Sequence, residues 1–272
     1  MGKATSAFAI GQGKPRDRHF RPALSVLFST KSDKDGEGLA FEGSGDSARA
    51  KPILPQQSNR VSELSQLSDE SRKAHWENVY TTRAENEVSW FEDNPALSIE
   101  LIDLARPAPQ SAIVDIGGGA SRLVDRLVAR GFLRVSVLDI SRASLEVAQK
   151  RLGDRAGLVR WIAADVTKWS PTQTFDIWHD RAAFHFLVDP ADRAAYIACT
   201  KKAVARGGHV IIGTFAKDGP EKCSGLPVSR YDAEGLADEL GEGFELVATR
   251  RHDHTTPWHS KQRFQFCVFR RT

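Results

Sequence analysis

Four aspartates and one glycine-rich turn are the residues whose types and spacing point most directly to chemistry. Each aspartate lies at, or directly after, the end of a short apolar segment typical of a buried strand. These aspartates are Asp115, Asp139, Asp165 and Asp180. The first begins the run Asp115-Ile-Gly117-Gly-Gly119, which leads into a predicted helix. Glycines there let a ligand approach the backbone closely, and a helix start favours negative charge.

The spacing narrows the ligand to two candidates, a dinucleotide and S-adenosylmethionine. Asp139 follows Gly117 by 22 residues, the separation at which an acid reaches ribose hydroxyls. A dinucleotide-binding turn has a further glycine where this sequence has Arg122. Asp115 suits a ligand with a cationic group, and S-adenosylmethionine carries an ammonium and a sulfonium but no phosphate. The pattern therefore favours S-adenosylmethionine.

Strands and helices alternate along residues 71–272, which predicts βαβ units and an α/β fold. The strands are expected at 112–116, 135–139, 159–163, 175–179, 209–215, 244–251 and 263–270. The helices are expected at 72–83, 95–105, from Ser121 onward, 141–152, 190–205 and 232–240. The connection 252–262 contains no helical pattern, which favours an antiparallel final pair. We expect a doubly wound, seven-stranded, mostly parallel sheet with an antiparallel C-terminal edge hairpin.

Four successive blocks resemble the signature blocks of the class I (Rossmann-like) S-adenosylmethionine-dependent methyltransferases, in order and in spacing. They are Asp115-Ile-Gly117-Gly-Gly119, Val137-Leu-Asp139, Ala164-Asp165-Val166 and Phe175-Asp-Ile-Trp-His-Asp180. The resemblance covers about residues 72–272 and is greatest to small methyltransferase-domain proteins that open with a helix such as Trp76-Glu-Asn-Val-Tyr80. The sequence departs from the family at Ser121, often a third glycine, and at Arg206, often a proline.

The resemblance implies a cofactor site. Asp115 would lie near the methionine amino group, and Gly117 and Gly119 would line the methionine moiety. Asp139 would accept both ribose hydroxyls. The adenine contacts would be Ile140, Asp165 and Val166, with Trp76 assigned to the same site.

Three side chains are the candidates for catalysis. Asp180 would lie near the sulfonium and the incoming nucleophile, while His179 or His185 would take a proton, because histidine titrates near neutrality. We expect the acceptor to meet the cofactor beneath a lid formed by residues 76–91 and 216–228. No metal site is expected, because His252, His254 and His259 match no zinc spacing and no cysteine or acid completes a set.

Composition excludes several function classes. The 272 residues carry a net charge of +3, too small to indicate a nucleic-acid partner. No apolar run reaches the roughly 18–20 residues that span a bilayer. Three widely spaced cysteines predict neither a disulfide framework nor a zinc ribbon.

Residues 1–70 have no helical or strand periodicity and are expected to be a disordered extension of the methyltransferase domain at 71–272. Residues 1–31 are basic, acid-poor and contain serine, a composition typical of a transit peptide. We therefore expect a mitochondrial or plastid location in a eukaryote and a cytoplasmic one otherwise.

The predicted function is methyl transfer from S-adenosylmethionine to an unidentified acceptor, either a small molecule or a protein side chain. Two alternatives stay open. One is a catalytically inactive binding module with the same fold, and the other is an NAD(P)-dependent oxidoreductase.

Overall fold

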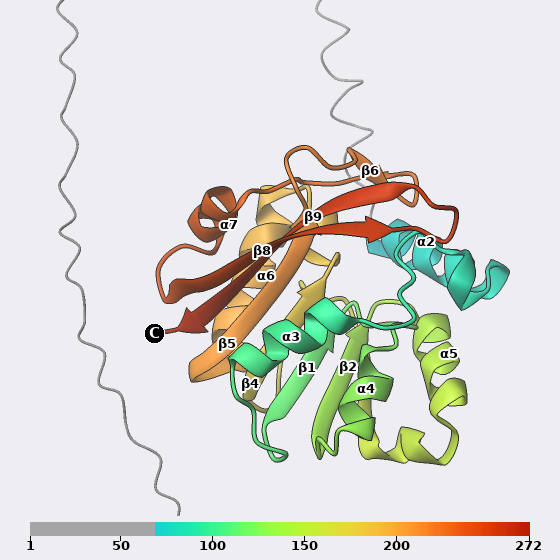
Figure 1. Ribbon diagram of the computed structural model, residues 1–272, viewed down its shortest axis with the longest axis horizontal. Coiled ribbons are helices and arrows are strands. Elements are labelled where there is room, and N and C mark those ends of the chain that lie inside the picture. Colours follow the sequence, from blue (N-terminus) through green and yellow to red (C-terminus); the bar gives the residue numbers. More distant parts are fainter. Residues whose placement is uncertain (1–68) are drawn as a thin grey trace, which may run out of the picture. The chain divides into compact units, whose positions relative to one another are not determined.

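The computed structural model describes residues 69–272, which form a seven-stranded sheet covered by helices on both faces (Figure 1). The predicted N-terminal extension and its targeting segment lie outside the described residues, apart from residues 69–70 at the start of the first helix. The seven strands are β1 (Ala112–Ile116), β2 (Arg134–Asp139), β3 (Val159–Ala163), β4 (Phe175–Arg181), β5 (Val204–Phe215), β8 (Phe244–Thr255) and β9 (Lys261–Arg271). A separate small pair consists of β6 (Lys222–Cys223) and β7 (Leu226–Pro227).

The strand order is β3-β2-β1-β4-β5-β9-β8. The five strands β1–β5 run parallel, whereas β9 pairs antiparallel with both β5 and β8. The predicted fold class, a mostly parallel seven-stranded sheet with an antiparallel C-terminal edge, is confirmed. In such a sheet the strand order reverses beside β1, so ligands bind beyond the carboxyl ends of β1, β2 and β4.

The helices are α2 (Asp69–Thr82), α3 (Ala96–Leu104), α4 (Leu123–Ala129), α5 (Arg142–Leu152), α6 (Pro190–Ala203) and α7 (Ala233–Leu240). Short 3-10 turns lie at η1 (Glu85–Glu87), η2 (Gly153–Leu158) and η3 (Phe184–Phe186). Helices α3, α4 and α5 pack in the core on one face of the sheet, and α6 and α7 pack in the core on the other. Helix α2 lies beside α5, near the end of the β8–β9 hairpin (Figure 1).

The two cores follow from the alternation of side chains along the central strands. In β1, Ile113 pairs with Ile177 of β4 and faces the first core, while Val114 pairs with Trp178 and faces the second. All four side chains are at most 1% exposed. Burying an apolar side chain of this size contributes about 1.5–3 kcal/mol, so the central pair anchors the sheet edge on which the site is built.

The C-terminal hairpin is longer than the pattern predicts. Strand β8 continues to Thr255 and β9 begins at Lys261, which leaves five residues, 256–260, between the strands instead of the 11 expected. The polar run from His252 to Thr255 resembled a loop. It forms a strand because β8 is an edge strand whose outer side faces water.

Two predicted helix starts are each shifted by one residue or more. Helix α3 begins at Ala96, with Pro95 at its N-cap, and not at residue 95 as expected. Helix α4 begins at Leu123, later than the expected start at Ser121. Its N-cap residue is Arg122, whose side chain makes no capping hydrogen bond. Ser141, where the next helix was expected to begin, is the N-cap of α5, and its side chain accepts from Ser144 N–H.

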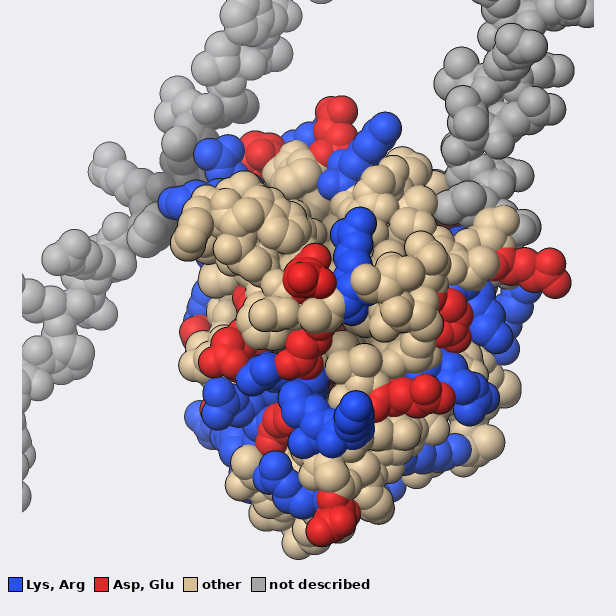
Figure 2. All heavy atoms as spheres, turned by 90° about the vertical axis from the view of Figure 1, so that its right-hand side faces the viewer, with Lys and Arg blue, Asp and Glu red and all other residues tan. Residues whose placement is uncertain are grey.

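The surface carries both signs of charge. On the face that includes α2 and α5, basic and acidic side chains are interspersed (Figure 2). Within residues 69–272, no helix has both the length and the apolar character needed to cross a membrane.

Candidate functional site

The glycine turn after β1 brings the backbone against the ends of two neighbouring strands. Gly117 and Gly119 have φ angles of 64° and 40°, which glycine adopts readily. A Cβ atom at Gly117 would lie 2.7 Å from the Cβ of Ala183, and one at Gly119 would lie 2.7 Å from Oδ2 of Asp139. The turn therefore needs glycine at both positions for conformation and for space.

A cavity of about 840 Å³ opens where β1, β2 and β4 end. Of the predicted cofactor residues, those on its wall are Trp76, Gly117, Asp139, Ile140, Asp165 and Val166, whereas Gly119 lines neither this cavity nor the second one described below. Further lining residues are Arg72, Tyr80, Trp90, Arg181, Phe186, Leu187 and Cys223, with several apolar strand-end residues. We call this the first cavity.

Asp139 lies on the wall of the first cavity, where its carboxylate can accept hydrogen bonds from a ligand. Its side chain is buried, and Oδ1 accepts from the N–H of Ser141 at 2.8 Å. Burial raises the pKa of this carboxyl to about 7, with repulsion from Asp115 and Glu77 acting in the same direction. A ligand that donates hydroxyls to the carboxylate would favour its ionised form.

Asp165 lies on the wall of the first cavity and is held there by Thr167 and Arg72. Its Oδ1 accepts from the N–H and the hydroxyl of Thr167 at 2.9 and 2.7 Å. Its Oδ2 lies 3.5 Å from the guanidinium of Arg72 on α2, which also pairs with Asp192. The ion pair links α2 to the strand ends, a role for Arg72 that no local sequence pattern signals.

A second cavity, of about 580 Å³, lies on the other side of the glycine turn. Asp115 and His179 both line it, and the Asp115 carboxylate is 2.7 Å from Nδ1 of His179. The other ring nitrogen of His179 is 3.0 Å from the hydroxyl of Ser98 on α3. All three side chains are buried, so the histidine is held on both sides.

Two arginines on the wall of the second cavity have buried N–H groups that make no hydrogen bond. Arg122 pairs with Glu85 and Asp93, and Arg181 donates to the carbonyl of Trp90 at 2.9 Å. Among residues 69–272, Nε of Arg122 and Nε of Arg181 have no hydrogen-bond partner, whereas Nη2 of Arg181 forms an ion pair with Glu92 at 3.2 Å. Unpaired buried donors are costly, so their place beside a cavity indicates an anionic ligand group.

The two cavities share four lining residues: Tyr80, Trp90, Gly117 and Arg181. The Trp90 indole N–H donates to the Tyr80 hydroxyl at 3.1 Å, and the Trp90 ring packs edge-on against Trp76 at 5.6 Å. One extended ligand could therefore span both cavities across Gly117.

The second predicted lid segment also lies beside this region. Cys223 of β6 lines the first cavity, and the next residue, Ser224, has its hydroxyl 3.1 Å from Nε2 of His75 on α2. Trp76, Tyr80 and Trp90 of the first segment and Cys223 of the second line the same cavity, and their role as a lid over the acceptor stays a prediction.

Asp180 does not lie where the sequence analysis placed it. It is fully buried and lines neither cavity. Its carboxylate accepts from the Tyr196 hydroxyl at 2.7 Å and from the N–H groups of Ala183 and Phe184 at 2.8 and 3.1 Å. Burial raises its pKa to about 6. The side chain turns inward because these donors of the β4–η3 turn and α6 lie there, and it fixes the turn that places Ala183 against Gly117.

His185 is likewise absent from both cavity walls. It is fully buried, and Nδ1 accepts from the N–H of Phe215 at 3.3 Å. Burial lowers the pKa of this imidazole to about 3, which disfavours a proton-accepting role at neutral pH. Of the three predicted catalytic side chains, His179 alone lines a cavity.

The absence of a metal site stays a prediction, but the structure places an acid beside two of the histidines considered for it. The structure brings Glu92, from the segment before α3, next to His252 and His254 of β8. Glu92 is about 160 positions from the two histidines in the sequence, so no motif spacing could have predicted that they meet.

Part of the chain matches a family model and a protein of described function. Residues 113–208 match the family model described as a methyltransferase domain. Nodulation protein S of Rhizobium tropici is 23% identical over 124 residues, which cover 46% of this chain and 51% of that protein. The chain thus aligns with about half the length of this curated relative.

Solved structures share the fold. The N-methyltransferase NodS from Bradyrhizobium japonicum WM9, in complex with S-adenosyl-L-homocysteine, is 20% identical with a TM-score of 0.55, covering 72% of this chain and 97% of that one. A structure from work on conversion of a disulfide bond into a thioacetal group during echinomycin biosynthesis is 18% identical with a TM-score of 0.61, covering 74% and 91%.

The sheet order and the glycine turn at its switch point define a Rossmann-like nucleoside-binding fold. The family model that matches residues 113–208 makes this part of the chain similar to the methyltransferase domains of the class I, S-adenosylmethionine-dependent type. The cofactor of this class is S-adenosylmethionine.

Proposed function

We propose that the protein transfers the methyl group of S-adenosylmethionine to a nitrogen atom of a small-molecule acceptor. The cofactor would span both cavities across Gly117. Its ribose hydroxyls would donate to Asp139, and its adenine would lie between Ile140 and Val166 with the amino group toward Asp165. The shared lining of the two cavities supports this placement.

The charges of the second cavity complement the methionine moiety. The buried Asp115 carboxylate suits the ammonium group. The unpaired donors of Arg122 and Arg181 suit the carboxylate, since arginine binds carboxylates through paired N–H groups. With the two ends held in this way, the sulfonium would lie at the junction of the cavities.

An aromatic wall at this junction is the observation that carries the assignment of nitrogen. The rings of Trp90 and Phe186 pack edge-on against Trp76, with centroids 5.6 and 4.9 Å away. Aromatic faces stabilise cations, including the sulfonium of the cofactor and the methylammonium that an amine acceptor becomes. The relatives NodS and the glycopeptide N-methyltransferase MtfA are described as N-methyltransferases, which supports the same choice.

The chemical step needs placement more than acid–base catalysis. The amine lone pair attacks the methyl carbon, the S–CH₃ bond breaks, and the sulfur leaves as a neutral thioether. The extra proton on nitrogen then passes to water. Holding the two reactants in line converts a bimolecular reaction into an effectively unimolecular one. His179 is bonded at both ring nitrogens, so we assign it the orientation of Asp115 and not the proton transfer.

The test begins with calorimetric titration of S-adenosylhomocysteine and, separately, NAD into the full chain. Isotope-labelled S-adenosylmethionine is then incubated with a panel of small amines, alcohols and thiols, and products are located by mass spectrometry. We expect S-adenosylhomocysteine to bind, NAD to give no heat, and the label to appear on nitrogen. Label on oxygen or sulfur would contradict the assignment of nitrogen. Binding without transfer would favour an inactive binding module, and binding of NAD an oxidoreductase.

Two variants of Trp76 test whether its aromatic face stabilises the reacting cation. Trp76→Phe keeps an aromatic face and Trp76→Leu removes it while filling much of the same space. We expect the leucine variant to lose at least about tenfold more turnover than the phenylalanine variant, because a desolvated cation–π contact contributes about 2 kcal/mol. Equal activity in the two variants would show that the aromatic face does not act on the reacting cation.

A further inference from the structure

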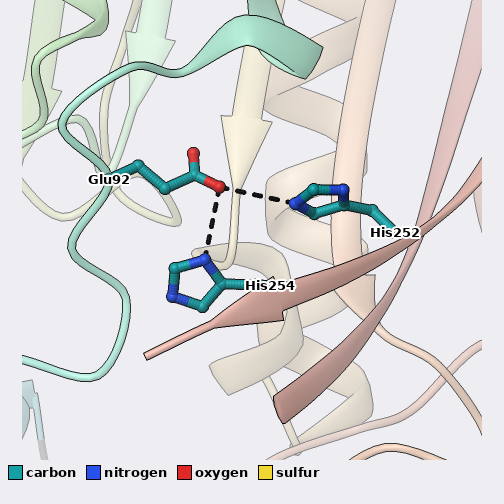
Figure 3. A group of neighbouring side chains, drawn as sticks. All are labelled: Glu92, His252 and His254. Carbon is teal, nitrogen blue, oxygen red and sulfur yellow. Dashed lines mark ion pairs between the residues drawn. The ribbon is translucent and has the colours of Figure 1, made fainter. Parts of the chain in front are cut away.

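Glu92, His252 and His254 form a cluster at the edge of the second cavity, whose wall includes Glu92 but neither histidine. The carboxylate of Glu92 points toward both imidazole rings, which project from the same side of β8 (Figure 3). Residues two apart on a strand share a face, so the extension of β8 beyond its predicted end brings both rings together. The side chain of His254 is 3% exposed, that of Glu92 20% and that of His252 34%.

The hydrogen bond of His254 determines which ring nitrogen is free to bind. Its Nε2 lies 2.7 Å from the backbone carbonyl oxygen of Ser89, and a carbonyl only accepts, so Nε2 carries the proton. Nδ1 of the neutral ring then presents a lone pair toward Oε1 of Glu92, 3.3 Å away. Two electron-rich atoms face each other, an arrangement that a cation between them stabilises. An imidazole fixed through its second nitrogen by a carbonyl is typical of metal-binding histidines.

Two of the ligand–ligand distances fit a tetrahedral metal ion, and the three ligand atoms all lie within 4.8 Å of one another. Zinc binds nitrogen and oxygen at about 2.0–2.2 Å, which places ligands of a tetrahedron about 3.3–3.6 Å apart. Oε1 of Glu92 is 3.3 Å from Nδ1 of His254 and 3.6 Å from Nε2 of His252. Ion pairs joined directly by a hydrogen bond are shorter, at about 2.7–2.9 Å.

The surroundings leave room for an ion and a route to it. The cluster borders an open surface hollow that Asp93 and Asp253 also line. Asp93 pairs with Arg122 and Asp253 with Lys261, while the guanidinium of Arg181 lies 3.2 Å from Oε1 of Glu92. A carboxylate oxygen has two lone pairs, so one can face the arginine while the other faces the ion.

We propose that Glu92, His252 and His254 bind one Zn²⁺ ion, with the fourth position open to the hollow. Two imidazoles and a carboxylate are a donor set that suits zinc. The ion would join the segment before α3 to the edge strand β8. That segment includes Trp90, which lines both cavities, so zinc would hold one wall of the binding region in place.

The experiment uses the full chain without a histidine tag, stripped of metal with a chelator and dialysed. Zinc is titrated by calorimetry, and bound zinc is quantified after gel filtration. The test variant is His252→Ala, whose exposed side chain can be removed with little effect on folding. The matched control is His259→Asn, in the turn of the same hairpin, where φ is 64° and asparagine is tolerated.

We expect one zinc ion per chain for the wild type and for His259→Asn, with affinity at least about tenfold lower in His252→Ala and Glu92→Gln. The melting temperature should rise with zinc in the wild type and not in His252→Ala. Replacement by Co²⁺ should give the intense visible absorption of a tetrahedral ion. Zinc binding no tighter in the wild type than in His252→Ala would overturn the proposal. Titration of S-adenosylhomocysteine into the metal-free wild type tests the proposed function separately, because no zinc is then present.

Discussion

The binding region has two ends that are built in different ways. At one end, the backbone of the glycine turn is packed against the carboxylate of Asp139 with no space for a methyl group at Gly119. At the other end, side chains make the contacts, such as His75 with Ser224, 149 positions apart, and Tyr80 with Trp90. The first end is rigid and intolerant of substitution, whereas the second depends on contacts that can be replaced one at a time.

The largest effect is expected at the rigid end. Gly119→Ala places a Cβ 2.7 Å from Oδ2 of Asp139 and should displace the carboxylate from the ribose hydroxyls. Losing two hydrogen bonds to a charged group, each worth about 1.5–3 kcal/mol, predicts affinity for S-adenosylhomocysteine about 100-fold weaker or more. Gly131→Ala is the matched control, because φ there is 82° but nothing lies within 4 Å of the new Cβ. Similar losses in both variants would attribute the effect to backbone strain.

A smaller effect should come from pH. Burial raises the pKa of Asp139 to about 7, and the ionised form accepts the ribose hydroxyls best. Affinity for S-adenosylhomocysteine should therefore be constant above about pH 8 and weaken as the pH falls below 7, by up to about tenfold per unit. The calorimetric titration is repeated from pH 8 to pH 6 with Asp139→Asn as control. A slope that persists in that variant would assign the titration to another group.

The fold itself should respond to Asp139 in the opposite sense. Because the native state holds the proton on Asp139 more tightly than the unfolded chain does, this group stabilises the native state as the pH falls from about 7 toward 4. The difference in unfolding free energy between the wild type and Asp139→Asn, followed by urea denaturation, should therefore shift in favour of the wild type at lower pH. A shift in the other direction would contradict the raised pKa.

At the side-chain-built end, single contacts should matter less. Arg72→Gln removes the partly buried pair with Asp165, and pairs of this kind contribute about 0.2–1 kcal/mol. We expect affinity for S-adenosylhomocysteine to fall about two- to fivefold. Lys73→Gln, at the next, exposed position of α2, should change nothing. A loss above tenfold for Arg72→Gln would mean that α2 is as essential to cofactor binding as the glycine turn.

Asp180→Asn should change cofactor affinity least. Its carboxylate accepts from Tyr196, Ala183 and Phe184 and lines neither cavity, so affinity should stay within about threefold. The unfolding free energy should instead fall by about 1–3 kcal/mol, because a buried donor loses its partner. A hundredfold loss of turnover with unchanged stability would return Asp180 to the reaction centre.

Features that follow from short sequence patterns were predictable. The strand and helix alternation predicts the parallel sheet, and the glycine turn with Asp139 and Asp165 predicts the first cavity. The positions of Asp180 and His185 were not predictable, because a polar residue at a strand end faces the cavity or the core according to the donors around it. Tyr196, which binds Asp180, comes from a helix on the far face.

Features made by tertiary contact left no local signal. Arg122 was noted only as the absence of a glycine, yet its Nε borders the second cavity. Glu92 meets His252 and His254 only because the segment before α3 crosses the end of β8. A longer β8 in the prediction would have placed the two histidines on one face, and the acid would still have been missing.

The central claim is that the cofactor spans both cavities with its ribose on Asp139, and titration of S-adenosylhomocysteine into the wild type and Asp139→Ala tests it most directly. The account predicts binding of one molecule per chain and affinity at least about tenfold weaker in the variant, since two hydrogen bonds to a charged acceptor are lost. Equal affinity in the two proteins, with both folded by circular dichroism, would contradict it.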